Sequence, residues 1–267
     1  MRVVVILGRV LDPGGITVNR RVGRIFINRE KYILQPADRC ALEAALRIKD
    51  SADCSNPTDA EVIALPRGPL PDDDVLRQAL ATGADRAVYL VGSPAQADDA
   101  VMARVLAATV EQLGGADLVL TGATTLDTGQ SQLGPRLAEA LGWPQIVDAW
   151  AVRAAGERVE VVCQNKTGYV IHDADLPAVV TVTPGSLKPR YPDGVRLVNV
   201  YKGVGEIAAA LEQWEVADLV DAEFLKPLLE QRGRDFPPMR ERGARASGTV
   251  DEMAQAAADA LYRRVSR

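Results

Sequence analysis

The stretch Leu118–Gly142 contains residue types that can bind a phosphate group. The apolar run Leu118–Leu120 leads into a loop rich in Gly, Thr, Ser and Gln, and a helix is predicted to begin between Gln132 and Pro135. Backbone N–H groups at a helix N-terminus can approach an anion closely when small residues precede them. Further donors in the loop are Thr124, Thr125, Thr128, Gln130, Ser131 and Gln132. The pattern predicts a phosphate- or nucleotide-binding loop, and a capped turn without a ligand remains the alternative.

Two further segments are predicted to lie at the same edge of the sheet as this loop. Gly8-Arg9-Val10 follows the apolar run Val3–Leu7, and Gln35-Pro36-Ala37-Asp38 opens the first long predicted helix. Ligands of open parallel sheets bind at the carboxyl ends of the strands, so both segments are candidates for nucleotide contacts. For Asp38 the leading interpretation is a helix N-cap, and a binding role is the alternative.

A basic loop follows the predicted strand Ala178–Thr183. Its residues Lys188-Pro189-Arg190-Tyr191-Pro192 are punctuated by proline. Arg190 could pair with a phosphate or a carboxylate, or it could simply be solvated. The arginine-rich stretch Arg232–Arg245 is interpreted as an extended arm that is solvated or faces a partner.

Composition argues against several classes of function. A net charge of −5 and an aromatic content of 4% disfavour nucleic-acid binding. Cys40, Cys54 and Cys163 form no Cys-x-x-Cys pair and His172 is the only histidine, so we expect no metal site. We interpret His172 as an ordinary strand residue. Paired carboxylates, an activated nucleophile, a P-loop and the dinucleotide fingerprint are all absent from the sequence, which predicts a binding protein that is not itself an enzyme.

Short apolar runs alternate with amphipathic helical segments in the first half of the chain. The predicted strands are residues 3–7, 61–65, 87–91 and 118–120, and the predicted helices are residues 36–50, 72–82, 97–113 and 135–141. This alternation favours an α/β fold with a parallel sheet. Residues 16–34 are predicted to form a hairpin that includes a strand at 25–28.

The pattern changes in the second half. Arg158–Cys163 and Tyr169–His172 flank Asn165-Lys166-Thr167-Gly168, which predicts an antiparallel hairpin. The chain ends in a predicted helix that begins with a capping box formed by Thr249 and Glu252.

A length of 267 residues suggests one large domain, or one domain with an appendage. We expect residues 1–200 to form a nucleotide-binding α/β domain and residues 201–267 to form an arm and a helix that dock on a partner. No apolar run approaches the ~20 residues of a membrane helix, and the first residues run directly into a predicted strand. We therefore expect a cytoplasmic protein that has no signal peptide and is not an integral membrane protein.

A series of motifs runs in a fixed order along nearly the whole chain. The segments are Val5–Pro13, Gln35–Leu46, Leu80–Ala87, Leu118–Pro144, Leu176–Thr183, Pro189–Pro192, Trp214–Leu219, Pro237–Gly243 and the capped last helix. Together they resemble the β subunit of electron transfer flavoprotein, also called the FixA-type subunit. Leu80–Ala87 is similar to the family's Ala-x-Gly-Ala-Asp-Arg/Glu-Ala motif. Each motif alone is weak, whereas their order is specific.

The resemblance implies a Rossmann-like fold of the adenine nucleotide α-hydrolase type, with a β-hairpin region and an extended C-terminal arm that ends in a helix. Family members pair with an α subunit that carries most contacts to a redox-active FAD, and the β subunit closes over this flavin. The β subunit binds AMP in its own loop, or a second FAD in flavin-bifurcating members. The heterodimer passes electrons from dehydrogenases to a quinone oxidoreductase, or takes them from NADH in bifurcating systems.

Loop chemistry and resemblance together give a set of expected cofactor contacts. These are Ile6, Gly8, Arg9, Gln35, Pro36, Ala37, Asp38, Arg67, Gly122, Ala123, Thr124, Thr125, Leu126, Asp127, Thr128, Gly129, Gln130, Ser131, Gln132, Leu133 and Gly134. The residues expected to contact partner proteins are Arg190, Tyr191, Val195 and Leu197. Ala123, Gly129 and Gln130 stand where the family commonly has Lys, an acid and Thr. AMP and FAD both remain open as ligands, and an adenine-nucleotide-binding module without a redox role remains the alternative function.

Overall fold

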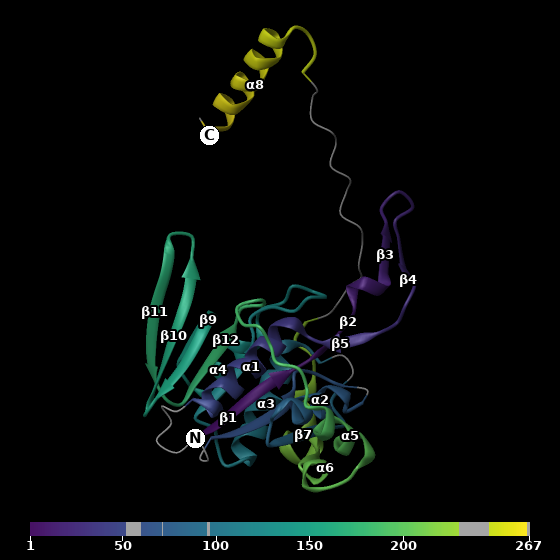
Figure 1. Ribbon diagram of the computed structural model, residues 1–267, viewed down its shortest axis with the longest axis vertical. Coiled ribbons are helices and arrows are strands. Elements are labelled where there is room, and N and C mark those ends of the chain that lie inside the picture. The colour runs from purple at the N-terminus through teal and green to yellow at the C-terminus, as the bar shows by residue number, and fades with distance from the viewer. Residues whose placement is uncertain (52–59, 71, 95–96, 230–245, 266–267) are drawn as a thin grey trace. The chain divides into compact units, whose positions relative to one another are not determined.

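The structure is a computed structural model that describes residues 1–51, 60–70, 72–94, 97–229 and 246–265 (Figure 1). Its internal contacts divide the chain into two units, Met1–Val18 with Ile25–Gln231 and Asn19–Arg24 with Arg232–Arg267. The larger unit contains the main sheet and its helices. The smaller unit contains helix α8 (Val250–Val265). The predicted capping box of α8 is confirmed, because the N–H of Thr249 donates to Glu252 Oε2 at 2.8 Å.

Nine strands form the main sheet in the order β11-β10-β9-β12-β8-β1-β6-β7-β13. Their bounds are β1 Arg2–Leu7, β6 Glu61–Pro66, β7 Arg86–Val91, β8 Leu118–Gly122, β9 Gln145–Ala155, β10 Arg158–Asn165, β11 Gly168–Asp175, β12 Ala178–Val182 and β13 Leu211–Glu215. β1 lies between β6 and β8 and pairs in parallel with both. Residues 3–7 of β1 are fully buried, as expected of a continuous apolar run whose two faces are covered.

The order of strands reverses next to β1. From β1 the chain moves outward through β6 and β7, and it then crosses back to place β8 on the other side of β1. β12 pairs in parallel with β8, and β9 pairs in parallel with β12. At that end of the sheet β10 is antiparallel to both of its neighbours, β9 and β11. In open α/β sheets a crevice forms at the carboxyl ends of the strands that flank such a reversal. A ligand site is therefore expected at the carboxyl ends of β1 and β8.

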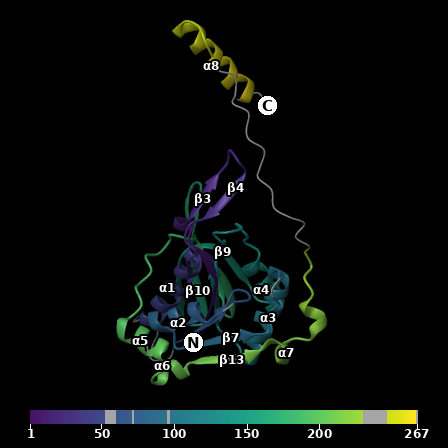
Figure 2. The same ribbon diagram turned by 90° about the vertical axis from the view of Figure 1, so that its right-hand side faces the viewer.

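Helices cover both faces of this sheet. Their bounds are α1 Pro36–Asp50, α2 Asp74–Thr82, α3 Asp99–Gln112, α4 Leu133–Leu141, α5 Gly194–Lys202, α6 Glu206–Ala209 and α7 Val216–Leu219. In Figure 2, α1 and α2 lie to the left of the strands and α3 and α4 lie to the right. Val5 and Leu7 of β1 pack in the apolar cluster with α1 and α2, whereas Val4 and Ile6 pack in the cluster with α3 and α4. Because successive side chains of a strand point to opposite faces of the sheet, β1 contributes residues to both apolar clusters.

Two small sheets follow β1. β2 (Arg9–Leu11) pairs with β5 (Tyr32–Leu34), and β3 (Ile16–Asn19) pairs with β4 (Arg24–Ile27). Short 3-10 turns occupy Pro13–Gly15 and Ala222–Leu225.

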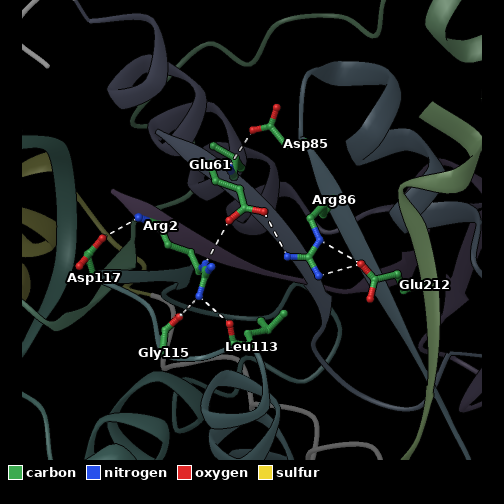
Figure 3. A network of polar contacts seen from close by, with 9 residues as sticks. Arg2, Glu61, Asp85, Arg86, Leu113, Gly115, Asp117 and Glu212 are labelled. Atoms are coloured by element: carbon green, nitrogen blue, oxygen red, sulfur yellow. Dashed lines mark hydrogen bonds and ion pairs between the residues drawn. The ribbon is translucent and has the colours of Figure 1, made fainter. Parts of the chain in front are cut away.

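Charged side chains connect the amino ends of four neighbouring strands (Figure 3). Arg2 on β1 pairs with Glu61 on β6 at 3.1 Å, and Glu61 also pairs with Arg86 on β7 at 3.2 Å. Arg86 in turn pairs with Glu212 on β13 at 2.7 Å. Each pair is partly exposed, so its individual contribution to stability is modest. Together the pairs link the strand ends at the edge opposite the β1–β8 crevice.

The predicted α/β class is confirmed, and the strands and helices expected in the first half are present with small shifts at their ends. The predicted hairpin around residues 165–168 is confirmed as β10 and β11. The strands β9 and β13 and the helices α5 to α7 were not predicted from the sequence. The predicted extended arm at residues 232–245 lies outside the described residues. Within the described part of the chain, no helix combines the length and hydropathy needed to cross a bilayer.

Candidate functional site

Asp38 joins the two strands that flank the crevice. Its side chain is fully buried and accepts two backbone hydrogen bonds, from the N–H of Gly8 to Oδ2 at 2.8 Å and from the N–H of Gly122 to Oδ1 at 2.9 Å. Gly8 follows β1 directly, and Gly122 is the last residue of β8. A single carboxylate therefore holds together the two loops that leave these strands.

This geometry corrects the interpretation of Asp38 as a helix cap. The N-cap of α1 is Gln35, and no side chain makes a capping hydrogen bond there. Gln35 instead donates from Nε2 to the carbonyl oxygen of Thr124 at 2.5 Å, and its backbone N–H donates to the carbonyl oxygen of Gly8 at 2.9 Å. Pro36 occupies the first helical position, where its missing N–H removes no intrahelical bond. The start of α1 is thus fixed to both loops.

Arg67 brings a cation to the same edge. It follows β6, and its Nη2 donates to Thr121 Oγ1 at 3.0 Å and to the carbonyl oxygen of Gly122 at 2.6 Å. Its Nε lies 3.3 Å from Asp38 Oδ2, yet among the described residues this buried atom has no hydrogen-bond partner. Burial raises the pKa of Asp38, and the Arg67 charge and the two N–H groups only partly oppose that shift.

The loop between β8 and α4 is exposed from Leu126 to Gln132. The N–H of Thr125 donates to the carbonyl oxygen of Gln130 at 2.9 Å, and the N–H of Gly129 donates to the carbonyl oxygen of Thr125 at 3.0 Å. Gly129 has a φ of 68°, a left-handed conformation that favours glycine. The loop's own hydrogen bonds therefore hold its shape.

The first turn of α4 presents backbone donors beside this loop. Its N-cap Gln132 makes no side-chain capping bond, and the N–H groups of Leu133 and Gly134 have no intrahelical acceptor because they belong to the first turn. Gly134 lets α4 approach β12 closely, since a Cβ atom there would lie 2.3 Å from Thr181 Cγ2. The positive end of the α4 dipole thus lies beside the carboxyl ends of β8 and β12.

Asp99 also lies at this site, although it was not predicted from the sequence. It lies half-buried in the first turn of α3. Burial raises its pKa, while the charges of Arg67 and Arg136 and the backbone N–H of Gln132 act in the opposite direction. Acidic residues are common at helix starts, and its neighbour Asp98 is the N-cap of α3. No sequence signal therefore distinguished Asp99 as part of the crevice.

Some predicted cofactor residues turn their side chains away from the crevice. The side chains of Ile6 and Leu133 are fully buried in the apolar cluster with α3 and α4, so only their backbone atoms are available to a ligand. The guanidinium of Arg9 lies over the ring of Tyr32, 4.1 Å from its centroid, and pairs with Asp72 at 2.8 Å. The crevice itself brings together Gly8, Gln35, Asp38, Arg67, Gly122 and Thr124.

The residues predicted to contact partners lie in the segment from the basic loop into α5. Arg190 pairs with carboxylates of its own chain, Glu43 at 2.9 Å and Asp50 at 2.7 Å. Tyr191 is 84% exposed and Val195 is 71% exposed, whereas Leu197 is half-buried. Contact of this segment with another protein stays a prediction. In the described residues, no group of His, Cys, Asp and Glu side chains is arranged to hold a metal ion.

Comparison with known proteins gives a consistent result. Residues 24–219 match the electron transfer flavoprotein domain family. The chain is 32% identical over 265 residues to the caffeyl-CoA reductase-Etf complex subunit CarD of Acetobacterium woodii, with 95% of each chain covered. It is 30% identical over 199 residues to electron transfer flavoprotein subunit beta of Megasphaera elsdenii, with 72% of each chain covered. Protein FixA of Rhizobium meliloti is 30% identical over 276 residues, covering 98% of this chain and 90% of the relative. The chain belongs to the electron transfer flavoprotein family, within the group of β and FixA-type subunits.

Proposed function

We propose that this chain is the β subunit of a heterodimeric electron transfer flavoprotein and that it holds AMP or a second FAD in the β1–β8 crevice. The observation that carries the proposal is the meeting of Gly8, Gly122 and Arg67 at the strand reversal, beside the first turn of α4. The redox-active FAD, held mainly by the α subunit, supplies the electron-transfer chemistry when bound.

The first turn of α4 and the positive charge of Arg67 suit a nucleotide phosphate. The first turn offers backbone N–H groups that have no intrahelical acceptor. Arg67 contributes its charge from the side, because its Nε faces Asp38 Oδ2 at 3.3 Å and its Nη2 donates to Thr121 and Gly122. Gly122 permits close backbone packing here, since a Cβ atom would lie 2.4 Å from Asp38 Oδ1. Asp99 opposes an anion by its charge, and the charges of Arg67 and Arg136 beside it act in the other direction. This chain's proposed part is therefore to bind and orient the nucleotide.

The electron donors and acceptors are a finer part of the proposal. Partner dehydrogenases would supply electrons and a quinone oxidoreductase would accept them, or NADH would be the donor in a bifurcating heterodimer. The relatives include a subunit of a caffeyl-CoA reductase-Etf complex and a FixA protein, and their names do not decide between the two schemes.

Nucleotide analysis of the heterodimer tests this function. The chain is co-expressed with its α subunit, the purified complex is denatured, and the released nucleotides are quantified by chromatography. One FAD and one AMP per heterodimer indicate a single-flavin carrier, whereas two FAD without AMP indicate a bifurcating type. A colourless complex that still releases AMP would favour the alternative, a nucleotide-binding module without a redox role.

A matched pair of variants tests the location of the nucleotide. Ser131 is exposed in the loop before α4, so its replacement leaves the core intact. Ser131→Asp places a carboxylate near the phosphate and should lower nucleotide occupancy at least about tenfold through charge repulsion, whereas Ser131→Asn should retain it. The α-subunit FAD serves as the internal control. Equal AMP content, or equal second-FAD content, in both variants would exclude the crevice as the site.

A further inference from the structure

A cavity lies on the side of α1 that faces β5 and α2. Its volume is about 280 Å³, and it is lined by residues of β5, α1, α2 and the loop 189–192. We call it the α1–β5 cavity. It is near the lower end of the volumes found for small-molecule pockets, so it suits a single small group. None of the contacts that form the β1–β8 crevice involves the side chains that line it.

The charges lining the α1–β5 cavity are mainly positive. Lys31, Arg39 and Arg190 supply cations, and Glu43 supplies a carboxylate. Glu43 accepts from Arg190 Nε at 2.9 Å and from Arg47 Nε at 2.8 Å. Burial raises the pKa of Glu43, but these hydrogen bonds outweigh burial and leave its pKa below the ordinary value. Glu43 is therefore paired with two arginines, and Arg190 is itself paired with Glu43 and with Asp50.

Two cations of the cavity, Arg39 and Lys31, form no ion pair with a described carboxylate, and Arg39 is the more buried of the two. It lies half-buried in the first turn of α1, and the described residues place no carboxylate in an ion pair with its guanidinium. A partly buried cation is poorly solvated, and binding an anion compensates for the lost water. A guanidinium also matches the geometry of carboxylate and phosphate groups, to which it can donate two parallel hydrogen bonds.

We propose that the α1–β5 cavity is a binding site for a small oxyanion, a phosphate or carboxylate group, held by Arg39 with Lys31 and Arg190 at its walls. The site is separate from the proposed nucleotide crevice, because Arg39 and Asp38 follow one another on α1 but face different sides of the helix: Asp38 is fully buried against Gly8 and Gly122, and Arg39 lines the cavity. The proposal does not depend on the bound nucleotide or on the redox role of the chain.

Titration of the full-length chain with inorganic phosphate or with succinate tests this site at constant ionic strength. The backbone amide signals of residues 31–34 and 39 are followed by nuclear magnetic resonance. Saturable shifts at these residues are expected for at least one of the two anions, and the anion that binds more tightly identifies the preferred group. Shifts that increase linearly with concentration, or that are confined to Gly8 and Gly122, would overturn the proposal.

Three variants separate a specific site from a general effect of charge. Arg39→Met should weaken binding at least about tenfold, which corresponds to loss of a hydrogen bond to a charged group. Arg39→Lys keeps the charge but loses the planar fork, and it should bind with intermediate affinity. Arg104→Met removes an arginine from α3 on the opposite face of the sheet and should have no effect. Equal affinity in the Arg39→Met and Arg104→Met variants would also overturn the proposal, and thermal unfolding confirms that each variant is folded.

Discussion

At the scale of single residues, Asp38 shows how one buried carboxylate can organise a ligand site. It is fully buried, and both oxygens accept backbone N–H groups from loops that leave different strands. The nearby Arg67 guanidinium balances its charge. The result is a rigid arrangement of backbone at the place where we propose that a nucleotide binds. Its role is to position the backbone of Gly8 and Gly122.

Replacing Asp38 by Asn tests this role. The amide group cannot accept at both of its polar atoms, and the substitution leaves Arg67 without its buried counter-charge. We expect the free energy of unfolding to fall by about 3 kcal/mol, measured by urea denaturation. Asp218→Asn, at an exposed position of α7, is the control and should change stability by less than about 0.5 kcal/mol. An Asp38→Asn protein as stable as the control would contradict the positioning role.

Glu43 is one of the carboxyl groups expected to make stability depend on pH. The hydrogen bonds from Arg190 and Arg47 depress the pKa of Glu43 below its ordinary value of 4.5. A carboxyl group whose pKa is lowered on folding stabilises the fold above the unfolded-state pKa, and this stabilisation is lost as the pH falls through the folded-state pKa. Glu43→Gln should therefore be less stable than the wild type at neutral pH, and the difference should shrink below pH 4.5.

Urea midpoints measured from about pH 7 to about pH 3 check this prediction, since that interval spans the ordinary carboxyl range. Glu139→Gln, at an exposed position on α4, is the matched control and should follow the wild-type curve. A constant difference between wild type and Glu43→Gln across the whole range would show that the variant acts through packing and not through ionisation.

At the scale of elements, the approach of α4 to the sheet depends on a missing side chain. Gly134 lies in the first turn of α4, and an added Cβ would collide with Thr181 Cγ2 on β12 at 2.3 Å. The close approach brings the N-terminus of α4 to the carboxyl ends of β8 and β12. Gly134 therefore shapes the crevice through packing, even though it was predicted only as a cofactor contact.

Replacing Gly134 by Ala should push α4 away from β12. We expect a loss of about 1–3 kcal/mol in the free energy of unfolding, the usual cost of overpacking a core. Thr181→Ser removes the colliding methyl group but keeps the hydroxyl that accepts the N–H of Asp148 at 3.0 Å, so the double variant should recover most of the loss. Gly194→Ala in α5, where the added Cβ meets no atom within 4 Å, should not destabilise the protein. Additive effects in the double variant would contradict the proposed collision.

At the scale of the whole molecule, the buried core belongs to the larger of the two units. Both apolar clusters are built from buried residues between Val3 and Val216. The smaller unit contributes α8, whose described side chains are exposed. The apolar residues Met253 and Leu261 of this helix are 37% and 65% exposed. We propose that these side chains are available to the α subunit, as the resemblance implies.

Removal of residues 232–267 should leave the urea midpoint of the remaining chain unchanged, because no described residue of the removed segment belongs to either apolar cluster. The same truncation should weaken the complex with the α subunit, which gel filtration over a range of concentrations would measure. A truncated chain that unfolds at lower urea would show that the C-terminal segment supports the core. A heterodimer of undiminished stability would count against docking through this segment.

The sequence by itself determined the α/β class, the main strands and helices of the first half, the β10–β11 hairpin and the capping box of α8. These features depend on hydrophobic periodicity, turn residues and helix caps, and each of these signals comes from residues that are close together in the sequence. β9 and β13 were missed because strand formation there depends on pairing with β12 and β7, which lie elsewhere in the chain. Local preference carries little information when distant partners decide the structure.

Only the tertiary structure decided what the polar residues do. Asp38 looked like a helix cap, but it holds the N–H of Gly122, which is 84 positions away in the sequence. Arg190 could have been solvated, but it pairs with Glu43, 147 positions away. The residues around Asp99 in the sequence gave no sign of a role at the site. In the fold it lies close enough to Arg67 for the positive charge of Arg67 to act on its pKa. Such assignments require the fold because charges and hydrogen bonds act over a few ångströms in space, whatever the separation along the chain.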